Sequence, residues 1–321
     1  MAESVDTMKK MSMPARTPEQ IEKTIRTGVA EIAYLDEGPQ TGTPIIFLHG
    51  FPDDPKTWDS VIDEIPHEDF RLLRPWQRGA GRSRIMDQAA SGAQVAALAQ
   101  DVLDFADGLA LRRFFLVGHD WGSRAAHGVA ALAPERVIGL VALATGYGSG
   151  TPSEEVKLRQ EQAFWYQWFF QTPHGRQTFE KDPKTFCEYL WRTWSPEWRF
   201  TREEYEVAAR SFSNPQFVET VLHYYSHRWK SAEGRTVYTR QQEILDASPP
   251  ILAPTIFVCG AADSCNLAEF SRGNERFYDS SYRRVEIPGV GHFPQRETPG
   301  LIAQIVRELV QLASVAVTWS K

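Results

Sequence analysis

The chain has 321 residues, of which 42% are hydrophobic and 24% charged, so it is long enough for one large domain with a sizeable core. Its formal net charge of -6 does not favour binding to nucleic acid or to an anionic membrane surface. The three cysteines, Cys187, Cys259 and Cys265, lack the spacing of a metal site and are typical of a reducing compartment without disulfides.

Residues 1–20 carry Lys9, Lys10 and Arg16 but no apolar segment, so we expect a short N-terminal extension rather than a signal peptide or a membrane anchor. No apolar run in the sequence approaches the roughly 20 residues that a membrane helix needs. We therefore expect a cytoplasmic protein, monomeric or homodimeric, whose partner is a small molecule rather than a membrane or a nucleic acid.

Short runs with the character of strands, most of them apolar, alternate with amphipathic stretches along the chain. The runs cover residues 45–48, 114–117, 137–143, 256–259 and 282–287. Such runs are typical of strands that are buried on both faces of a parallel sheet, and the amphipathic spacing predicts covering helices over residues 95–109, 123–132 and 301–313. The pattern predicts an α/β fold with a mostly parallel sheet and helices on both faces. In such sheets a ligand binds beyond the carboxyl ends of the strands.

The composition changes at about residue 148. From there to about residue 235 no strand pattern occurs, and aromatic side chains concentrate instead, as in the segment 164–170. Strand patterns resume near residue 251. We expect a helical lid, residues 148–235, inserted between a first core part, residues 26–147, and a second core part, residues 236–321. The N-terminal extension, residues 1–25, precedes both.

The segment Gly118-His119-Asp120-Trp121-Gly122 follows one of the apolar runs and precedes a helix-like stretch. A strand that ends on Gly-x-x-x-Gly and turns directly into a helix is the pattern of a nucleophile elbow, in which the middle residue stands at the end of the sheet. That residue is serine in ester hydrolases, but here it is Asp120. A carboxylate is suited to displacement at a saturated carbon, which forms an ester to be hydrolysed later. The pattern therefore indicates the opening of strained rings or the displacement of a good leaving group such as halide.

Two later strands end in residues that would complete a triad with Asp120. His292 follows the last run, and the ordinary pKa of histidine, near neutral pH, suits a general base. Asp263 follows the run before it and is expected to orient His292. Nucleophile, acid and histidine then occur in the order that this kind of sheet requires. The backbone N–H of Phe51, after the first run, and that of Trp121 are expected to hold an oxyanion.

These residues resemble the α/β-hydrolase-fold epoxide hydrolases over about residues 25–315. The elbow and the turn His49-Gly50-Phe51-Pro52 match that family, and so does the lid segment Tyr166-Gln167-Trp168-Phe169-Phe170-Gln171-Thr172-Pro173. The resemblance implies hydrolysis of an epoxide to a vicinal diol through an ester on Asp120, without a metal or a cofactor. It also implies that Tyr166 and a second lid tyrosine, Tyr225, bind the epoxide oxygen and supply a proton. The neighbouring Tyr224 stays open as an alternative to Tyr225.

Two other functions stay open at this point. Haloalkane dehalogenases share the Asp-Trp elbow, and a lid tryptophan such as Trp165 or Trp168 would then help the elbow tryptophan to bind halide. Arg124 lies four residues after the elbow aspartate, as does an arginine of fluoroacetate-type dehalogenases, and would bind a substrate carboxylate. A non-catalytic ligand-binding protein on the same fold is the second alternative. We expect Trp168, Tyr224 and Arg124 to contact the substrate.

Overall fold

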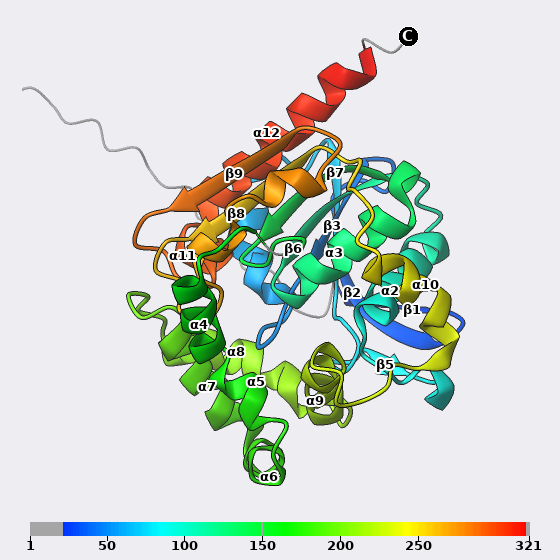
Figure 1. The fold of residues 1–321 in the computed structure, drawn as a ribbon. Coiled ribbons are helices and arrows are strands. Elements are labelled where there is room, and N and C mark those ends of the chain that lie inside the picture. Colours follow the sequence, from blue (N-terminus) through cyan, green and yellow to red (C-terminus); the bar gives the residue numbers. More distant parts are fainter. Residues whose placement is uncertain (1–21, 149, 319–321) are drawn as a thin grey trace, which may run out of the picture.

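The computed structural model describes residues 22–148 and 150–318, in which helices cover a nine-stranded sheet (Figure 1). The strands are β1 (Glu22–Arg26), β2 (Ala30–Glu37), β3 (Thr43–Leu48), β4 (Phe70–Pro75), β5 (Arg84–Ile85), β6 (Phe114–His119), β7 (Val137–Leu143), β8 (Thr255–Gly260) and β9 (Tyr282–Ile287). The α-helices are α1 (Asp59–Ile62), α2 (Val95–Gly108), α3 (Trp121–Leu132), α4 (Glu154–Ala163), α5 (Trp165–Phe169), α6 (Pro173–Lys181), α7 (Pro183–Trp194), α8 (Arg202–Ala209), α9 (Phe217–Arg228), α10 (Thr239–Asp246), α11 (Pro294–Glu297) and α12 (Pro299–Thr318).

The larger part of the sheet is parallel. Strands β4, β3, β6, β7, β8 and β9 lie side by side in this order and run in the same direction, which confirms the predicted mostly parallel sheet. Strands β1 and β2 add an antiparallel edge beside β4, and β5 pairs with β2. We did not expect this edge from the sequence. Residues 22–25 were expected in the N-terminal extension, but they belong to β1, while Lys9, Lys10 and Arg16 lie outside the described residues.

Alternating side chains of the parallel strands are buried on opposite faces of the sheet. In β3, Ile46 and Leu48 join a core that includes α2 and α3, while Ile45 and Phe47 join a core that includes α1 and α12. Successive strand residues point to opposite faces. Because both faces are covered by helices, nearly every position of the central strands is apolar, which explains why these strands are recognisable in the sequence.

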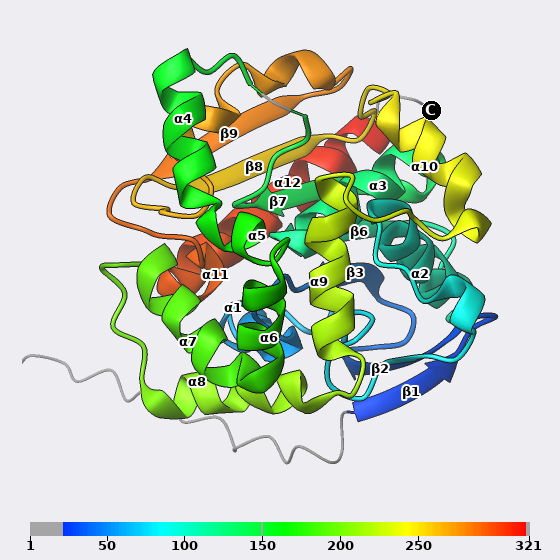
Figure 2. The same ribbon diagram turned by 60° about the horizontal axis from the view of Figure 1, so that its bottom comes forward.

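The chain leaves the sheet after β7 and returns at β8. In between, helices α4 to α9 form a separate layer that lies over one end of the sheet, which confirms the predicted helical insertion (Figure 2). This layer contacts loops that follow the carboxyl ends of strands: Trp191 of α7 donates to the carbonyl of Pro52 after β3, and Ser195 accepts from His292 after β9. A functional site is therefore expected between the lid and the strand ends. None of the helices in residues 22–148 and 150–318 combines the length and the hydropathy that a membrane crossing requires.

Candidate active site

The tight turn between β6 and α3 carries Asp120. Its φ of 51° and ψ of -114° lie outside the regions that side chains ordinarily adopt, and its backbone N–H donates to the carbonyl of Leu143 in β7. The two glycines of the motif lie where backbones approach closely. A Cβ at Gly118 would lie 2.5 Å from the carbonyl oxygen of Gly122, and one at Gly122 would lie 2.2 Å from that of Leu48. The chain thus has the strained turn that the glycine spacing predicted.

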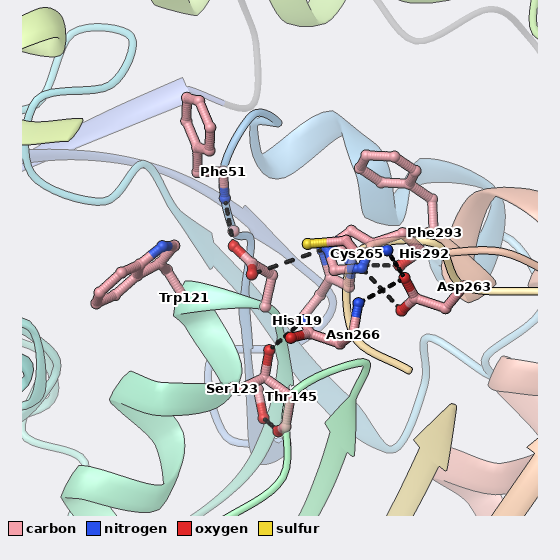
Figure 3. A network of polar contacts seen from close by, with 12 residues as sticks. Phe51, His119, Trp121, Ser123, Thr145, Asp263, Cys265, Asn266, His292 and Phe293 are labelled. Atoms are coloured by element: carbon pink, nitrogen blue, oxygen red, sulfur yellow. Dashed lines mark hydrogen bonds and ion pairs between the residues drawn. The ribbon is translucent and has the colours of Figure 1, made fainter. Parts of the chain in front are cut away.

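The carboxylate of Asp120 is buried, and its two oxygen atoms face Phe51 and His292, both of which are labelled in Figure 3. Oδ1 accepts a hydrogen bond of 2.9 Å from the backbone N–H of Phe51, in the loop after β3. Oδ2 lies 3.8 Å from Nε2 of His292. Burial raises the pKa of Asp120, while His292 and the backbone N–H groups of Phe51 and Trp121 act to lower it. The two backbone donors named in the sequence analysis therefore converge on this carboxyl group.

His292 lies in the loop after β9 and is fully buried. Its Nδ1 donates to Oδ2 of Asp263 over 2.9 Å, so Nε2 is the unprotonated nitrogen of the neutral ring, and Nε2 makes no hydrogen bond with any described residue. Oδ1 of Asp263 accepts from the backbone N–H groups of Cys265 (2.7 Å) and Asn266 (2.9 Å), which fixes this carboxylate from both sides. Burial lowers the pKa of His292, but the charge and hydrogen bond of Asp263 outweigh it, and the pKa is raised overall.

Two residues that the sequence analysis missed hold the backbone of His292. Nε2 of His119 donates to its carbonyl over 2.7 Å, and burial keeps His119 neutral by lowering its pKa well below the ordinary value. From the lid, Oγ of Ser195 accepts from the backbone N–H of His292 over 2.7 Å and donates to Glu297 over 2.8 Å. His119 stood in the elbow motif, but its partner lies 173 residues further along the chain, and no motif marks Ser195.

The lid brings two tyrosines close to Asp120. Tyr166 in α5 and Tyr225 in α9 are each 1% exposed, and their ring centroids lie 5.2 Å apart. Nε2 of Gln167 donates to the hydroxyl of Tyr166 over 2.7 Å. Burial, followed by nearby acidic groups that include Asp120, raises the pKa of both hydroxyls well above the ordinary value. Both phenols are therefore neutral and able to donate a hydrogen bond.

Trp121 distinguishes the two neighbouring tyrosines of α9. Its Nε1 donates to the hydroxyl of Tyr225 over 3.2 Å, whereas the ring of Tyr224 stacks on the indole, with centroids 4.3 Å apart and planes 16° apart. The hydroxyl of Tyr225 is thus the one held beside the elbow, and Tyr224 forms an aromatic wall next to it. This hydrogen bond occupies the indole N–H of Trp121, which in a dehalogenase would be needed to bind the halide.

Trp168 does not lie at this site, contrary to our expectation. Its side chain is 41% exposed and packs on Trp229 with ring centroids 4.0 Å apart, and Trp165 is 40% exposed. Each residue of a helix turns by about 100°, so a position two residues after the inward-facing Tyr166 points outward. The tryptophan that does reach the site is Trp194 of α7, whose ring centroid lies 4.9 Å from that of His292.

Arg124, in the first turn of α3, borders three cavities, and two of them are also lined by Arg228. One of these two, of about 310 Å³, is also lined by Trp121 and Tyr224, and the other, of about 230 Å³, by Thr145 and Asn266. Burial has the largest effect on the pKa of Asp120 and raises it, whereas Arg124 is among the groups that lower this pKa. The guanidinium therefore lies within electrostatic reach of the elbow and faces open space, a position that fits the substrate contact we expected.

The chain matches the model of the alpha/beta hydrolase fold family over residues 43–299. It is 24% identical to epoxide hydrolase A of Mycobacterium tuberculosis, with 90% of this chain and 97% of that protein covered. It is 26% identical to an epoxide hydrolase of Caballeronia sordidicola, with 90% and 93% covered. The crystal structure of a Klebsiella pneumoniae protein, provisionally described as an epoxide hydrolase, matches with a TM-score of 0.83 and 31% identity over 90% of this chain and 96% of that one. The chain belongs to the alpha/beta hydrolase fold family.

Proposed function

We propose that this chain hydrolyses epoxides to vicinal diols through an ester on Asp120. The observation that carries the proposal is the pairing of a buried carboxylate on the elbow with two neutral phenols from the lid, Tyr166 and Tyr225. A carboxylate opens a strained ring efficiently only if the departing oxygen receives a proton, because an alkoxide is a poor leaving group. The epoxide hydrolases among the relatives support the same assignment.

In the first half-reaction, Oδ2 of Asp120 attacks one ring carbon while Oδ1 stays with the N–H of Phe51. The carbon–oxygen bond of the ring breaks, and the oxygen keeps the electron pair and takes a proton from Tyr166 or Tyr225. The products are a hydroxyalkyl ester of Asp120 and one tyrosinate. The hydrogen bond of 3.2 Å from Nε1 of Trp121 stabilises that charge when it resides on Tyr225.

In the second half-reaction, Nε2 of His292 takes a proton from water, and the hydroxide attacks Cγ of the ester. Negative charge develops on Oδ1, and the N–H groups of Phe51 and Trp121 already stabilise negative charge on this carboxyl group. The ester bond breaks, and the diol oxygen takes the proton held by His292. The acid proton left on Asp120 returns to the tyrosinate, so one epoxide and one water give one diol.

The His292→Gln variant tests this proposal, because loss of the base should leave the ester intact. The variant is incubated with a mixed panel of epoxides, haloalkanes and haloacids, and the mass of the intact protein is measured. We expect a gain equal to a whole epoxide, mapped by peptide analysis to Asp120 and absent from the Asp120→Ala/His292→Gln double variant. Diol formation by the wild type without any adduct on His292→Gln would contradict the ester mechanism.

Dehalogenation is the second candidate, and one observation favours it. Nε1 of Trp194 is buried without a hydrogen-bond partner among the described residues, next to His292. A free indole N–H is a donor suited to a leaving halide. In the same mass experiment, dehalogenation would give a gain equal to a halogenated substrate minus its hydrogen halide, and epoxides would leave the protein unmodified.

A further inference from the structure

Two arginines beside the site lack the acidic partner that the other arginines of the interior have. Arginines with a buried side chain that do pair with an aspartate or a glutamate include Arg71, Arg74, Arg78 and Arg296. The side chains of Arg124 in α3 and Arg228 in α9 form no ion pair or hydrogen bond with any residue in 22–148 or 150–318. Their contacts are aromatic: the guanidinium of Arg124 lies 5.2 Å from the ring centroid of Trp121, and that of Arg228 lies 4.9 Å from that of Phe164. An aromatic face attracts a cation but leaves its N–H donors available to an acceptor with lone pairs.

Both arginines line the cavity of about 230 Å³, and none of the described residues around it is an aspartate or a glutamate. Its polar lining consists of the two guanidinium groups, amides and hydroxyls, including Thr145 after β7 and Asn266 in the turn that holds Asp263. The cavity of about 310 Å³ is also lined by both arginines, but Glu233 and Asp246 contribute negative charge there. An anion is therefore favoured in the smaller cavity.

The surroundings of Arg124 are unfavourable for a cation that has no counter-ion. Burial, with the like charge of Arg228, lowers the pKa of Arg124 to about 9. The position of Arg124 in the first turn of α3 further destabilises its charged form, because the N-terminus of a helix carries partial positive charge. A carboxylate between the two arginines would relieve both effects and accept the free N–H donors in charge-assisted hydrogen bonds.

We infer that Arg124 and Arg228 together bind a carboxylate of the substrate, so that the epoxides this chain hydrolyses best are epoxy acids. This inference rests on the proposed function and adds the class of substrate to it. The epoxide ring lies at Asp120 while the carboxylate occupies the cavity of about 230 Å³. Only acids whose chain spans that separation satisfy both ends.

The first experiment compares terminal epoxy acids of four, six and eight carbons with the primary amides of the same length, at pH 8. The amide matches the acid in size but carries no charge. We expect the best acid to exceed its amide in kcat/KM by roughly ten- to a hundredfold on the wild type, the range for hydrogen bonds to a charged group. Arg124→Gln and Arg228→Gln should each reduce the acid-to-amide ratio toward one, and Arg124→Lys should keep part of it, because lysine keeps the charge without the planar fork.

The matched control is Arg112→Gln, which removes the same charge from an exposed position in the loop before β6. It should leave the acid-to-amide ratio as in the wild type. If acid and amide react equally well on the wild type, or if Arg124→Gln slows both to the same extent, the carboxylate site is refuted while the proposed function stands.

A binding experiment separates failure of this inference from failure of the proposed function, since it needs no turnover. Calorimetry measures octanoate and octanamide on the wild type and on Arg124→Gln. If no epoxide reacts but octanoate binds at least about tenfold more tightly than octanamide, and Arg124→Gln loses this difference, the anion site stands and the epoxide chemistry falls. Equal affinities for the two probes, together with no turnover, would overturn both.

Discussion

The core and the lid of this molecule contribute to the site in opposite ways. The core supplies the carboxylates Asp120 and Asp263, each fixed at the end of a strand by backbone N–H donors. The lid supplies neutral hydroxyls, Tyr166 and Tyr225, which are held among aromatic rings and kept protonated by burial. Groups that must carry charge thus stand where the backbone provides dipoles, and groups that must stay neutral stand where it does not.

In the proposed mechanism, the two half-reactions depend on different groups. Formation of the ester needs the core nucleophile and the lid donors, whereas the reacting groups that hydrolyse the ester all belong to the core. Variants of the core and of the lid should therefore fail at different steps.

Replacing Asp120 by Ala should abolish both steps, because no other carboxylate lies at the elbow. We expect diol formation to fall by a factor on the order of 10⁵ or more, as for loss of a covalent nucleophile. Diol is measured by mass spectrometry after incubation with an epoxide that the wild type turns over, and urea unfolding checks that the variant is folded. A variant that retains a tenth of the activity would show that the core carboxylate is not the nucleophile.

Asp263→Asn should impair hydrolysis of the ester but not its formation. We expect ester decay to slow by a factor on the order of 10⁴, as in other triads that lose this charge. In the wild type the pKa of His292 is raised, and the base acts only when neutral. The rate of ester decay should therefore increase with pH to a plateau, with a midpoint above 6.5. Without Asp263 the effect of burial dominates, the pKa of His292 falls, and the midpoint should move to lower pH.

Rapid-quench measurements of the ester at several pH values check this prediction. The adduct should accumulate on Asp263→Asn at close to the wild-type rate of formation. A midpoint that stays in place, or a loss of ester formation, would mean that Asp263 does not act through His292.

Replacing both lid tyrosines by Phe should impair ring opening and spare the hydrolysis of a preformed ester. We expect ester formation to slow by about 10³-fold in the Tyr166→Phe/Tyr225→Phe variant and by roughly ten- to a hundredfold in each single variant. Stopped-flow tryptophan fluorescence follows this step, since Trp121 donates to Tyr225. Tyr189→Phe removes the same atom from an exposed lid tyrosine and should react as the wild type does.

An unimpaired double variant would contradict the role of the lid. Equal slowing of ester formation and ester decay would contradict the division between the two parts, because it would indicate general damage to the site.

Ser195→Ala tests the place where lid and core meet, and its effect should be the smallest. The change leaves the buried backbone N–H of His292 without its acceptor, so we expect the free energy of unfolding to fall by about 1–3 kcal/mol. Ester decay should slow by only about tenfold, because Asp263 and His119 still hold the histidine. Urea unfolding measures the first effect, with the exposed Ser213→Ala as control. Equal stabilities of the two variants would show that the contact does not couple lid and core.

Much of the core site was predictable from the sequence, because its geometry requires particular residues. A turn as tight as the one at Asp120 needs glycine where backbones approach closely, and strands buried on both faces are apolar. The regular alternation of strands then placed His292 and Asp263 at the same end of the sheet, where the structure finds them.

The lid and the contacts across the molecule were less predictable. The sequence indicated helices but not their rotation, so Trp168 was wrongly placed at the site and Trp194 was missed. Ser195 contacts His292 across 97 residues of chain, a separation that no local pattern reports. The antiparallel strands β1 and β2 were missed because they form the edge of the sheet, and β1 is largely exposed.

In the proposed mechanism, water attacks the ester of Asp120 and never the epoxide, and isotope labelling in a single turnover distinguishes these two routes. Excess enzyme reacts with limiting epoxide in water enriched in oxygen-18, and both the diol and the peptide that contains Asp120 are analysed by mass spectrometry. We expect the label to appear in the carboxylate of Asp120 and the first-turnover diol to carry none. Label in that diol, with an unlabelled Asp120, would mean that water opens the ring itself and would contradict the mechanism.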